Sequence, residues 1–275
     1  MAVTTLINGS ADDTISPLDR GLAYGDGLFE TVRFIGASAP LWQRHMQRLD
    51  ESCRRLHIPE PDAAQLWDEA ISVTRDLPHA VVRITLTRGV GERGYALPVS
   101  PSLTRIVAAF VAPVLPAKNY AQGVHIRVCE LRLAAQPALA GIKHLNRLEQ
   151  VLARAEWSDP AIAEGLLCDT DGRVVCATMA NVFAVIDGAL LTPLVDRCGV
   201  AGVARAEVLQ AFPQARISDI PLDALRRAEE IFLTSSVRGI VPVSLLGDRV
   251  YAPGTITRTV QQHWHTLGFS MEQAG

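Results

Sequence analysis

Residues 141–150 read Gly-Ile-Lys-His-Leu-Asn-Arg-Leu-Glu-Gln, and Lys143 lies near the start of this stretch. The spacing of Leu145, Leu148 and Leu152 predicts an amphipathic helix that begins at the lysine. A lysine held by a packed helix among apolar neighbours has a lowered pKa, because burial disfavours the charged amine. Such a lysine can lose its proton and act as an amine nucleophile.

An ordinary exposed lysine near a helix start is the alternative interpretation of the same residues. Two observations favour the reactive amine. The chain has only two lysines, Lys118 and Lys143, while arginine supplies the other basic side chains. The residues that flank Lys143 are also mostly apolar.

Composition limits the classes of protein to which the chain can belong. Its 275 residues suffice for two domains of ordinary size, and a hydrophobic content of 48% suffices for a core. The net charge of -3, with arginines scattered along the chain, gives no electrostatic reason to expect nucleic acid or an anionic membrane as a partner.

The cysteines and the N-terminal segment predict a cytoplasmic protein. The five cysteines are odd in number and lack the spacing of a metal site, which favours reduced thiols. Neither they nor the seven histidines suggest a metal centre. Residues 1–13 lack the pattern of a signal peptide, and no window is long and apolar enough to predict a membrane span.

Strand and helix patterns alternate along the chain, and hairpin turns, predicted at Asp171-Gly172 and Asp187-Gly188, join the strands as often as helices do. This predicts an α+β fold with two domains. We expect a smaller N-terminal domain over residues 1–113, a linker over 114–121, and a larger C-terminal domain over 122–275 that carries Lys143. The expected strands are Thr4–Asn8, Leu28–Phe34, Ala80–Thr87, Arg105–Val111, Val124–Val128, Gly165–Cys168, Asn181–Val185, Ala189–Leu191 and Glu230–Thr234; the expected helices are Trp42–Leu56, Asp62–Arg75, Val203–Phe212 and one near the C-terminus.

Three further segments have the chemistry of an anion site. Gly202 precedes a predicted helix, whose free amides and dipole attract a phosphate. Ser235-Ser236 follows an apolar strand and offers hydroxyl donors. Arg48 can contact a phosphate in a bidentate manner. Each also has an ordinary interpretation, as a helix start, a strand-end turn and a solvated arginine, and their spacing does not bring them together.

Motifs along nearly the whole chain resemble those of the pyridoxal-phosphate family that includes branched-chain and D-amino-acid aminotransferases. The resemblance rests on residues 16–21, 24–30, 45–49, 87–95, 140–150, 181–183, 199–205 and 235–242. It implies the two-domain fold type IV of these enzymes, pyridoxal 5'-phosphate as cofactor, a small-molecule substrate and a homodimer. The Lys143 stretch, together with Arg93-Gly94-Tyr95, is most similar to the lyases of this family.

The resemblance also implies roles for individual residues. Lys143 matches the Schiff-base lysine, which also moves the proton on the substrate's α-carbon. The residues implied to bind the cofactor are Arg48, Arg147, Val203, Ala204, Ser235 and Ser236, and those implied to bind the substrate are Tyr24, Glu30, Arg93 and Tyr95.

Cys176 departs from the family pattern. The family places a glutamate five residues before the asparagine of its Asn-x-Phe motif, where it pairs with the protonated pyridine nitrogen. Counting back from Asn181, that position is Cys176. A neutral thiol cannot favour the protonated ring as a carboxylate does, so we expect a weaker electron sink.

The activity implied is elimination of pyruvate from 4-amino-4-deoxychorismate to give p-aminobenzoate. The gain of an aromatic ring drives this reaction, so it tolerates a weaker electron sink than amino transfer does. The alternatives are an aminotransferase for D- or branched-chain amino acids, and a weakened or non-catalytic homologue that kept the fold.

Overall fold

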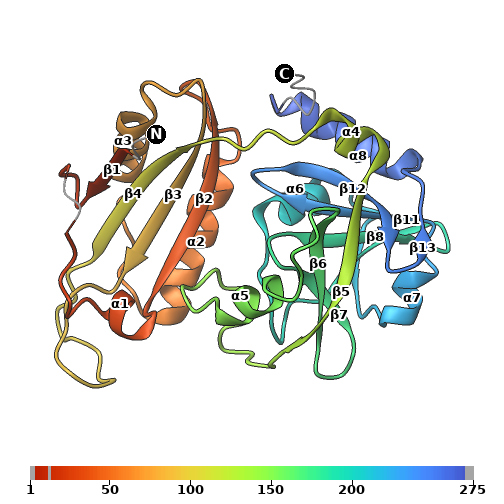
Figure 1. Cartoon of the computed structure of the whole chain (residues 1–275). Coiled ribbons are helices and arrows are strands. Elements are labelled where there is room, and N and C mark those ends of the chain that lie inside the picture. Colours follow the sequence, from red (N-terminus) through yellow and green to blue (C-terminus); the bar gives the residue numbers. More distant parts are fainter. Residues whose placement is uncertain (1–3, 12–13, 270–275) are drawn as a thin grey trace. The chain divides into compact units, whose positions relative to one another are not determined.

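The computed structural model describes residues 4–11 and 14–269, and it folds into two compact units. The first unit comprises residues 1–113 together with 142–146, and the second comprises 114–141 and 147–275. Figure 1 labels the elements of both units. Part of the N-terminal segment considered above, residues 1–3 and 12–13, lies outside the described residues.

The first unit is an antiparallel sheet with two helices packed against it. Its strands lie in the order β1-β4-β3-β2, and α2 and α3 share one hydrophobic core with them. The elements in chain order are β1 (Thr4–Ile7), α1 (Arg20–Tyr24), β2 (Gly27–Ile35), α2 (Trp42–Leu56), α3 (Ala63–Thr74), β3 (His79–Thr87) and β4 (Thr104–Val111).

Local signals in the sequence account for both long helices of this unit. Helix α2 has the predicted bounds, and its apolar stripe, which includes Met46, Leu49 and Cys53, is buried. Helix α3 begins after Asp62, whose carboxylate accepts hydrogen bonds from the amides of Ala64 and Gln65. Both helices are therefore confirmed, to within a residue at each end.

The second unit is built on a nine-stranded mixed sheet. Along the main path its strands lie in the order β10-β9-β8-β11-β12-β5-β6-β7, and β13 pairs with β12. Strand β5 runs parallel to both β12 and β6. The elements are α4 (Ala117–Gln122), β5 (Val124–Leu133), α5 (Leu148–Arg154), β6 (Ile162–Asp169), β7 (Val174–Ala177), β8 (Asn181–Ile186), β9 (Ala189–Pro193), α6 (Val203–Ala211), β10 (Arg216–Ser218), α7 (Leu222–Arg226), β11 (Glu230–Ser235), β12 (Gly239–Leu246), β13 (Arg249–Val250) and α8 (Thr255–Thr266).

Two hairpins of this unit turn where the sequence predicts. Strands β6 and β7 pair across a turn in which Gly172 has φ 79°. Strands β8 and β9 pair across Asp187 and Gly188, at φ 50° and 72°. Both turns need residues that tolerate positive φ. Antiparallel and parallel pairs thus share one sheet beside helices, which confirms the α+β class.

The division of the chain differs from the expected domains in two respects. The first unit does end at residue 113, apart from a later segment. Residues 114–121, expected as a linker, are counted with the second unit and contain most of α4. Residues 142–146, expected in the C-terminal domain, pack with the first unit, so Lys143 lies there.

The prediction that a helix begins at Lys143 is wrong. Helix α5 begins at Leu148, and residues 142–147 are not helical. The side chains of Leu148 and Leu152, expected on the buried face, are 75% and 61% exposed. The backbone of residues 143–145 pairs with a strand instead, a long-range contact that overrides the local helical pattern.

All five cysteines are free and buried. Among the described residues, no helix combines the length and the apolar character needed to cross a membrane.

Asp26 holds two buried arginines in the first unit. Its carboxylate accepts hydrogen bonds from Arg20 and Arg88, at 2.8 Å from the Nε of each. Arg88 also donates to the carbonyls of Leu56 and His57, at the C-terminal end of α2. Burial tends to raise the pKa of Asp26, but its hydrogen bonds and charge interactions with the two arginines lower it overall. The ionised carboxylate therefore joins α1, β3 and α2.

Replacement of Asp26 by Asn should destabilise the first unit strongly. Two guanidinium groups would remain buried without their counter-charge, and loss of one partner of such a cluster costs about 3–5 kcal/mol of unfolding free energy. Urea denaturation followed by circular dichroism would measure this. The control is Asp223→Asn, since Asp223 is 80% exposed and pairs only loosely with Arg226. Equal stability of the two variants would contradict the role of Asp26.

Candidate active site

The backbone around Lys143 is fixed by the free edge of β2. The amide of Phe29 donates to the carbonyl of Lys143, and the amide of Leu145 donates to the carbonyl of Gly27, both at 3.0 Å. These two bonds surround the antiparallel bridge between Leu28 and His144. The segment thus behaves as a short additional strand of the first sheet.

Side chains alternate along this short strand. Ile142 is buried in the core of the first unit at 1% exposure. Lys143 is half-buried, and its Nζ lies 4.1 Å from the centre of the Phe29 ring. An ammonium over an aromatic face is attracted by the ring's quadrupole. The amine of Lys143 is therefore held in a defined position by its backbone and by an aromatic side chain.

Asn146 ends the segment with a close contact to Gly25. Its Nδ2 donates to the carbonyl of Gly25 at 3.1 Å. Gly25 has φ 65° and ends α1, and a Cβ there would lie 2.4 Å from Oδ1 of Asn146. Only glycine satisfies both the left-handed backbone and the close approach of the asparagine.

Arg48 and Glu30, assigned to phosphate and substrate by resemblance, contact each other. Arg48 Nε donates to Glu30 Oε1 at 2.8 Å, and a second guanidinium nitrogen contacts Oε2. His45 Nδ1 also lies 2.6 Å from Oε2. Burial tends to raise the pKa of Glu30, but the charge of Arg48 and the contact with His45 hold it at about 2.

His45 completes this cluster as a neutral group. Burial lowers its pKa, against the effect of Glu30, so the imidazole is uncharged near pH 7. Its Nε2 is buried without a hydrogen-bond partner in the described part of the chain. The side-chain charges of Glu30 and Arg48 therefore balance each other, and the carboxylate of Glu30 fixes the position of the arginine.

Of the residues assigned to the substrate, Arg93 and Tyr95 lie on one loop of the first unit, and Tyr24 ends α1. The rings of Tyr24 and Tyr95 are 5.5 Å apart, and the hydroxyl of Tyr24 accepts a hydrogen bond from the amide of Gly94. Tyr95 is 86% exposed and Arg93 is also exposed. The structure thus brings Tyr24 and Tyr95 together and leaves the arginine in solvent.

In the second unit, the predicted cofactor residues lie where several strands begin and end. Asn181 opens β8 and pairs directly with Thr234 near the end of β11. Cys176 belongs to β7, immediately before β8 in the chain. A hairpin turn over residues 236–238 follows β11, with Gly239 at φ 73°. Asn181 and the turn that follows β11 therefore lie at the same end of the paired strands β8 and β11.

Asn181 fixes the loop that precedes α6. Its Nδ2 donates to the carbonyl of Val200 at 2.9 Å. A Cβ on Gly202 would lie 2.0 Å from its Oδ1, so the loop can approach only with glycine there. Gly202 is the N-cap of α6, and no side chain caps the first amides, which belong to Val203 and Ala204. Such free amides at the positive end of a helix dipole can bind a phosphate.

The serines lie in the hairpin between β11 and β12. Ser235 pairs with Gly239, and its Oγ accepts a hydrogen bond from the amide of Arg238 at 2.9 Å. The Ser235 hydroxyl therefore shapes the turn, and Ser236 lies at its first position.

Cys176 lies in an apolar cluster beneath the loop before α6. The thiol is 6% exposed, and its Sγ would lie 3.9 Å from a Cβ on Gly199. Burial, with smaller effects from Cys198 and Glu164, raises the pKa of Cys176 to about 12. The thiol is therefore neutral. Arg147 is near enough to interact electrostatically with it, and burial lowers the pKa of that arginine.

Glu164 is a buried carboxylate near Cys176 that the motifs did not indicate. It is 2% exposed, and it accepts hydrogen bonds from the amide of Gly165 and the hydroxyl of Thr178. The predicted turn at Asp171-Gly172 could have indicated this contact. If residues are paired across the β6–β7 hairpin outward from that turn, Thr178 lies opposite Gly165, next to Glu164.

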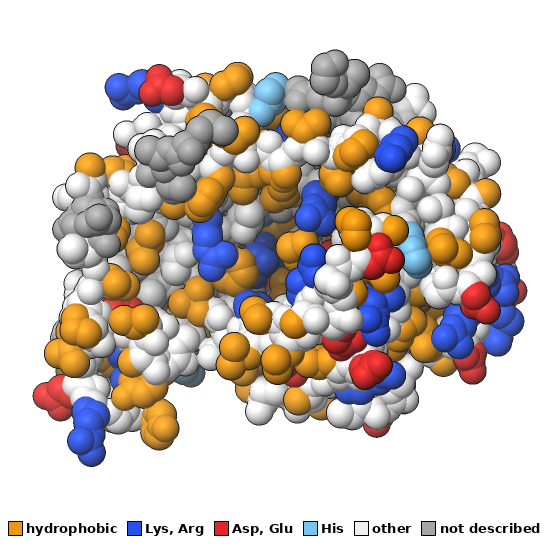
Figure 2. Space-filling view, in the orientation of Figure 1, with side chains coloured by type: hydrophobic (Ala, Val, Ile, Leu, Met, Phe, Trp, Pro, Cys, Tyr) orange, Lys and Arg blue, Asp and Glu red, His pale blue; other side chains and the backbone are white. Residues whose placement is uncertain are grey.

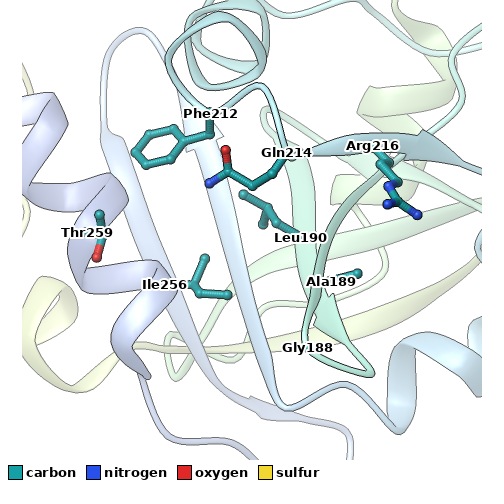
Figure 3. Close-up of a pocket in the computed structure, with 8 residues that line it drawn as sticks. All are labelled: Gly188, Ala189, Leu190, Phe212, Gln214, Arg216, Ile256 and Thr259. Atoms are coloured by element: carbon teal, nitrogen blue, oxygen red, sulfur yellow. The ribbon is translucent and has the colours of Figure 1, made fainter.

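A further hollow in the second unit contains none of the predicted site residues (Figure 3). It has a volume of about 390 Å³ and lies at the Gly188 turn, at the opposite end of β8 from Asn181. Phe212, Gln214 and Arg216 line it on one side, and Ile256 and Thr259 of α8 on another. It is distinct from the strand ends described above.

The predicted site residues thus form two groups. Those of the first unit are Tyr24, Glu30, Arg48, Arg93, Tyr95 and Lys143, and those of the second are Arg147, Cys176, Val203, Ala204, Ser235 and Ser236. Each group lies on segments held by hydrogen bonds within its own unit.

Comparison with known proteins gives consistent results. The model of the class IV amino-transferase family matches residues 27–246. A relative from Vibrio harveyi, named aminodeoxychorismate lyase, is 34% identical over 94% of this chain and 99% of its own. A putative branched-chain-amino-acid aminotransferase from Methanocaldococcus jannaschii is 30% identical over 93% of this chain and 92% of its own.

A solved structure has the same fold over nearly the whole chain. The 4-amino-4-deoxychorismate lyase of Pseudomonas aeruginosa superimposes with a TM-score of 0.91 at 45% sequence identity, covering 95% of this chain and 98% of that one. The chain therefore belongs to the class IV aminotransferase family.

Proposed function

We propose that this protein is a pyridoxal-phosphate-dependent lyase that converts 4-amino-4-deoxychorismate into p-aminobenzoate and pyruvate. The observation that carries the proposal is the fixed position of Lys143, whose neighbouring backbone is bonded to β2 and whose amine lies over Phe29. The similarity to lyases from two bacteria, at 34% and 45% identity, supports this activity over others in the family.

The residues present fit the cofactor in most respects. Lys143 offers an amine for covalent attachment, and the uncapped start of α6 behind Gly202 offers amides to the phosphate. Gly202, against which the side chain of Asn181 packs, has no side chain of its own that could cover those amides. Arg48, fixed by Glu30, would add a bidentate phosphate contact. The exception is the carboxylate expected beside the pyridine nitrogen, because Cys176 occupies that position.

In the proposed reaction, Nζ of Lys143 takes the proton from the substrate carbon that bears the amine. Bound pyridoxal phosphate supplies an electron sink for that carbon. The C–O bond to the enolpyruvyl group then breaks, and Lys143 returns the proton to the departing group. The ring that remains is aromatic, which supplies driving force and makes a neutral Cys176 tolerable. Tyr95 and Arg93, on their exposed loop, would bind the substrate carboxylates.

The first test is formation of p-aminobenzoate from 4-amino-4-deoxychorismate by the cofactor-loaded protein, without any keto acid. We expect product from the wild type and a rate lower by about 10³-fold or more in Lys143→Ala, which removes the amine. Lys118→Ala is the matched control, because Lys118 is the other lysine of the chain and is exposed on α4.

Absence of product from the loaded wild type would remove the lyase assignment. Amino transfer to a keto acid from a branched-chain or D-amino acid would then favour the aminotransferase alternative, which the relative from Methanocaldococcus jannaschii keeps open.

The second prediction concerns Cys176. Its thiol is neutral, so the ring nitrogen of bound cofactor should be less protonated than beside a carboxylate. The variant Cys176→Glu should raise the pKa of that nitrogen by about 1–3, since an opposite charge favours the cation. Titration of the cofactor's absorbance against pH measures it, with Cys198→Ser, in the same apolar cluster, as control. Identical titration curves for wild type and Cys176→Glu would refute this assignment of Cys176.

We also propose that the protein is a homodimer. Apolar side chains lie exposed on α5, where Leu148, Val151 and Leu152 are at 61–75% exposure. Figure 2 shows apolar side chains at the surface over this part of the second unit. An apolar helix face of this kind is typical of an interface. A cytoplasmic location is likewise proposed, because the five free, buried cysteines suit a reducing compartment.

Sedimentation equilibrium tests the dimer. We expect twice the chain mass of 29.7 kDa for the wild type, and a shift toward the monomer for Leu148→Glu, which would bury a charge in the interface. Val250→Glu is the control, because Val250 is equally exposed, at 77%, but lies on β13. A monomeric wild type, or a Leu148→Glu variant that stays dimeric, would contradict this interface.

A further inference from the structure

Arg205 is a buried cation without a counter-charge. Its side chain is 6% exposed, its Nε donates to Oγ1 of Thr192 at 3.2 Å, and a second nitrogen donates to the carbonyl of Pro193 at 3.0 Å. Both acceptors are neutral. Within the part of the chain that the structure describes, no carboxylate pairs with this guanidinium.

The buried arginines described in the first unit are paired with carboxylates. Arg88 shares Asp26 with a second arginine, and Arg48 binds Glu30. Burial lowers the pKa of Arg205 to about 10, so it still carries its charge near pH 7. An unpaired buried charge is costly, and such groups are usually paired with an ion or ligand. A missing anion would account for this arginine.

The position of Arg205 indicates where that anion would lie. It is the third residue of α6, and side chains on a helix lean toward its N-terminus. The first amides of α6 are uncapped, and the helix dipole adds positive potential at the same end. The charge of Arg205, the dipole of α6 and the uncapped amides of its first turn would therefore all favour an anion near Gly202.

Thr234 gives an independent indication of a ligand at this place. Its hydroxyl is buried, with the residue 1% exposed, and it has no hydrogen-bond partner in the described structure. Thr234 pairs directly with Asn181, so the two side chains lie on the same face of the sheet. Asn181 touches Gly202 on that face. The unsatisfied hydroxyl therefore lies beside the start of α6.

We propose that Arg205 supplies the fixed positive charge, and Thr234 a hydroxyl donor, of an anion site at the N-terminus of α6 that takes the cofactor's phosphate. The inference rests on the proposed use of pyridoxal phosphate, and it adds to the phosphate site two residues to which the resemblance assigned no role. Arg205 attracts the anion electrostatically without direct contact, while the hydroxyl of Thr234 donates a hydrogen bond to it.

The Thr234→Val variant separates ligand binding from folding. It removes a buried hydroxyl that has no partner, so the cofactor-free full chain should be as stable as wild type or more stable. Affinity for pyridoxal phosphate should fall about tenfold, since one hydrogen bond to a charged group is lost. Affinity for pyridoxal, which lacks the phosphate, should not change. If the hydroxyl is merely structural, the variant will be less stable and both affinities will fall together.

Arg205→Met and Arg205→Lys test the charge. In the methionine variant, the ratio of the affinity for pyridoxal phosphate to that for pyridoxal should fall at least about tenfold. The attraction between a buried charge and a phosphate is weakly screened by solvent and salt, so its loss has a large effect. The lysine variant, which keeps the charge, should stay within about threefold of wild type. Arg127→Met is the control, because Arg127 lies in the same unit and is already paired with Glu156.

An unchanged affinity ratio in both Arg205→Met and Thr234→Val would overturn the inference; if Arg205→Met does not fold, Thr234→Val alone decides. These outcomes differ from failure of the proposed function. A wild-type chain that binds neither compound would refute the cofactor, whereas one that binds pyridoxal phosphate without lyase activity would leave the anion site intact.

Discussion

The backbone pairing of residues 143–145 with β2 is the constraint on which the rest of the site depends. The register is decisive, because successive side chains of a strand point to opposite faces. It places Ile142 in the core and Lys143 over Phe29; a slip by one residue would bury the lysine and expose the isoleucine. The segment also covers an otherwise open strand edge. Within the second unit, Gly141 exchanges hydrogen bonds with Gly199 and Ala201, in the loop that leads to α6.

The two units differ in how their buried arginines are paired. In the first, Arg20 and Arg88 share Asp26, and Arg48 is paired with Glu30 beside His45. In the second, Arg205 and Glu164 are both buried, and each is hydrogen-bonded only to neutral groups within the described residues. Protein interiors usually pair such groups. The buried charge of Arg205 is therefore one that the proposed anion at the start of α6 would balance.

Elements with strong local signals could be predicted from the sequence. The stripe of α2, the Asp62 cap of α3 and the Asp-Gly turns each depend on residues close together in the chain. The segment at Lys143 was predicted as a helix because the leucines after it have helical spacing; its pairing with β2, more than a hundred residues earlier, leaves no local pattern. The same limit applies to the site. Family motifs indicated Arg48 and Glu30 separately, but their ion pair, and the burial of Glu164 beside Cys176, depend on strand register.

The central claim is that Lys143 is the amine to which the cofactor attaches. Its most direct test is reduction of the cofactor-loaded protein with borohydride, followed by proteolysis and mass spectrometry. The chain has only Lys118 and Lys143 as side-chain amines, so the result is unambiguous. We expect the reduced pyridoxyl group on the peptide that contains Lys143. Modification of Lys118 instead, or of neither lysine in protein that has bound the cofactor, would contradict it.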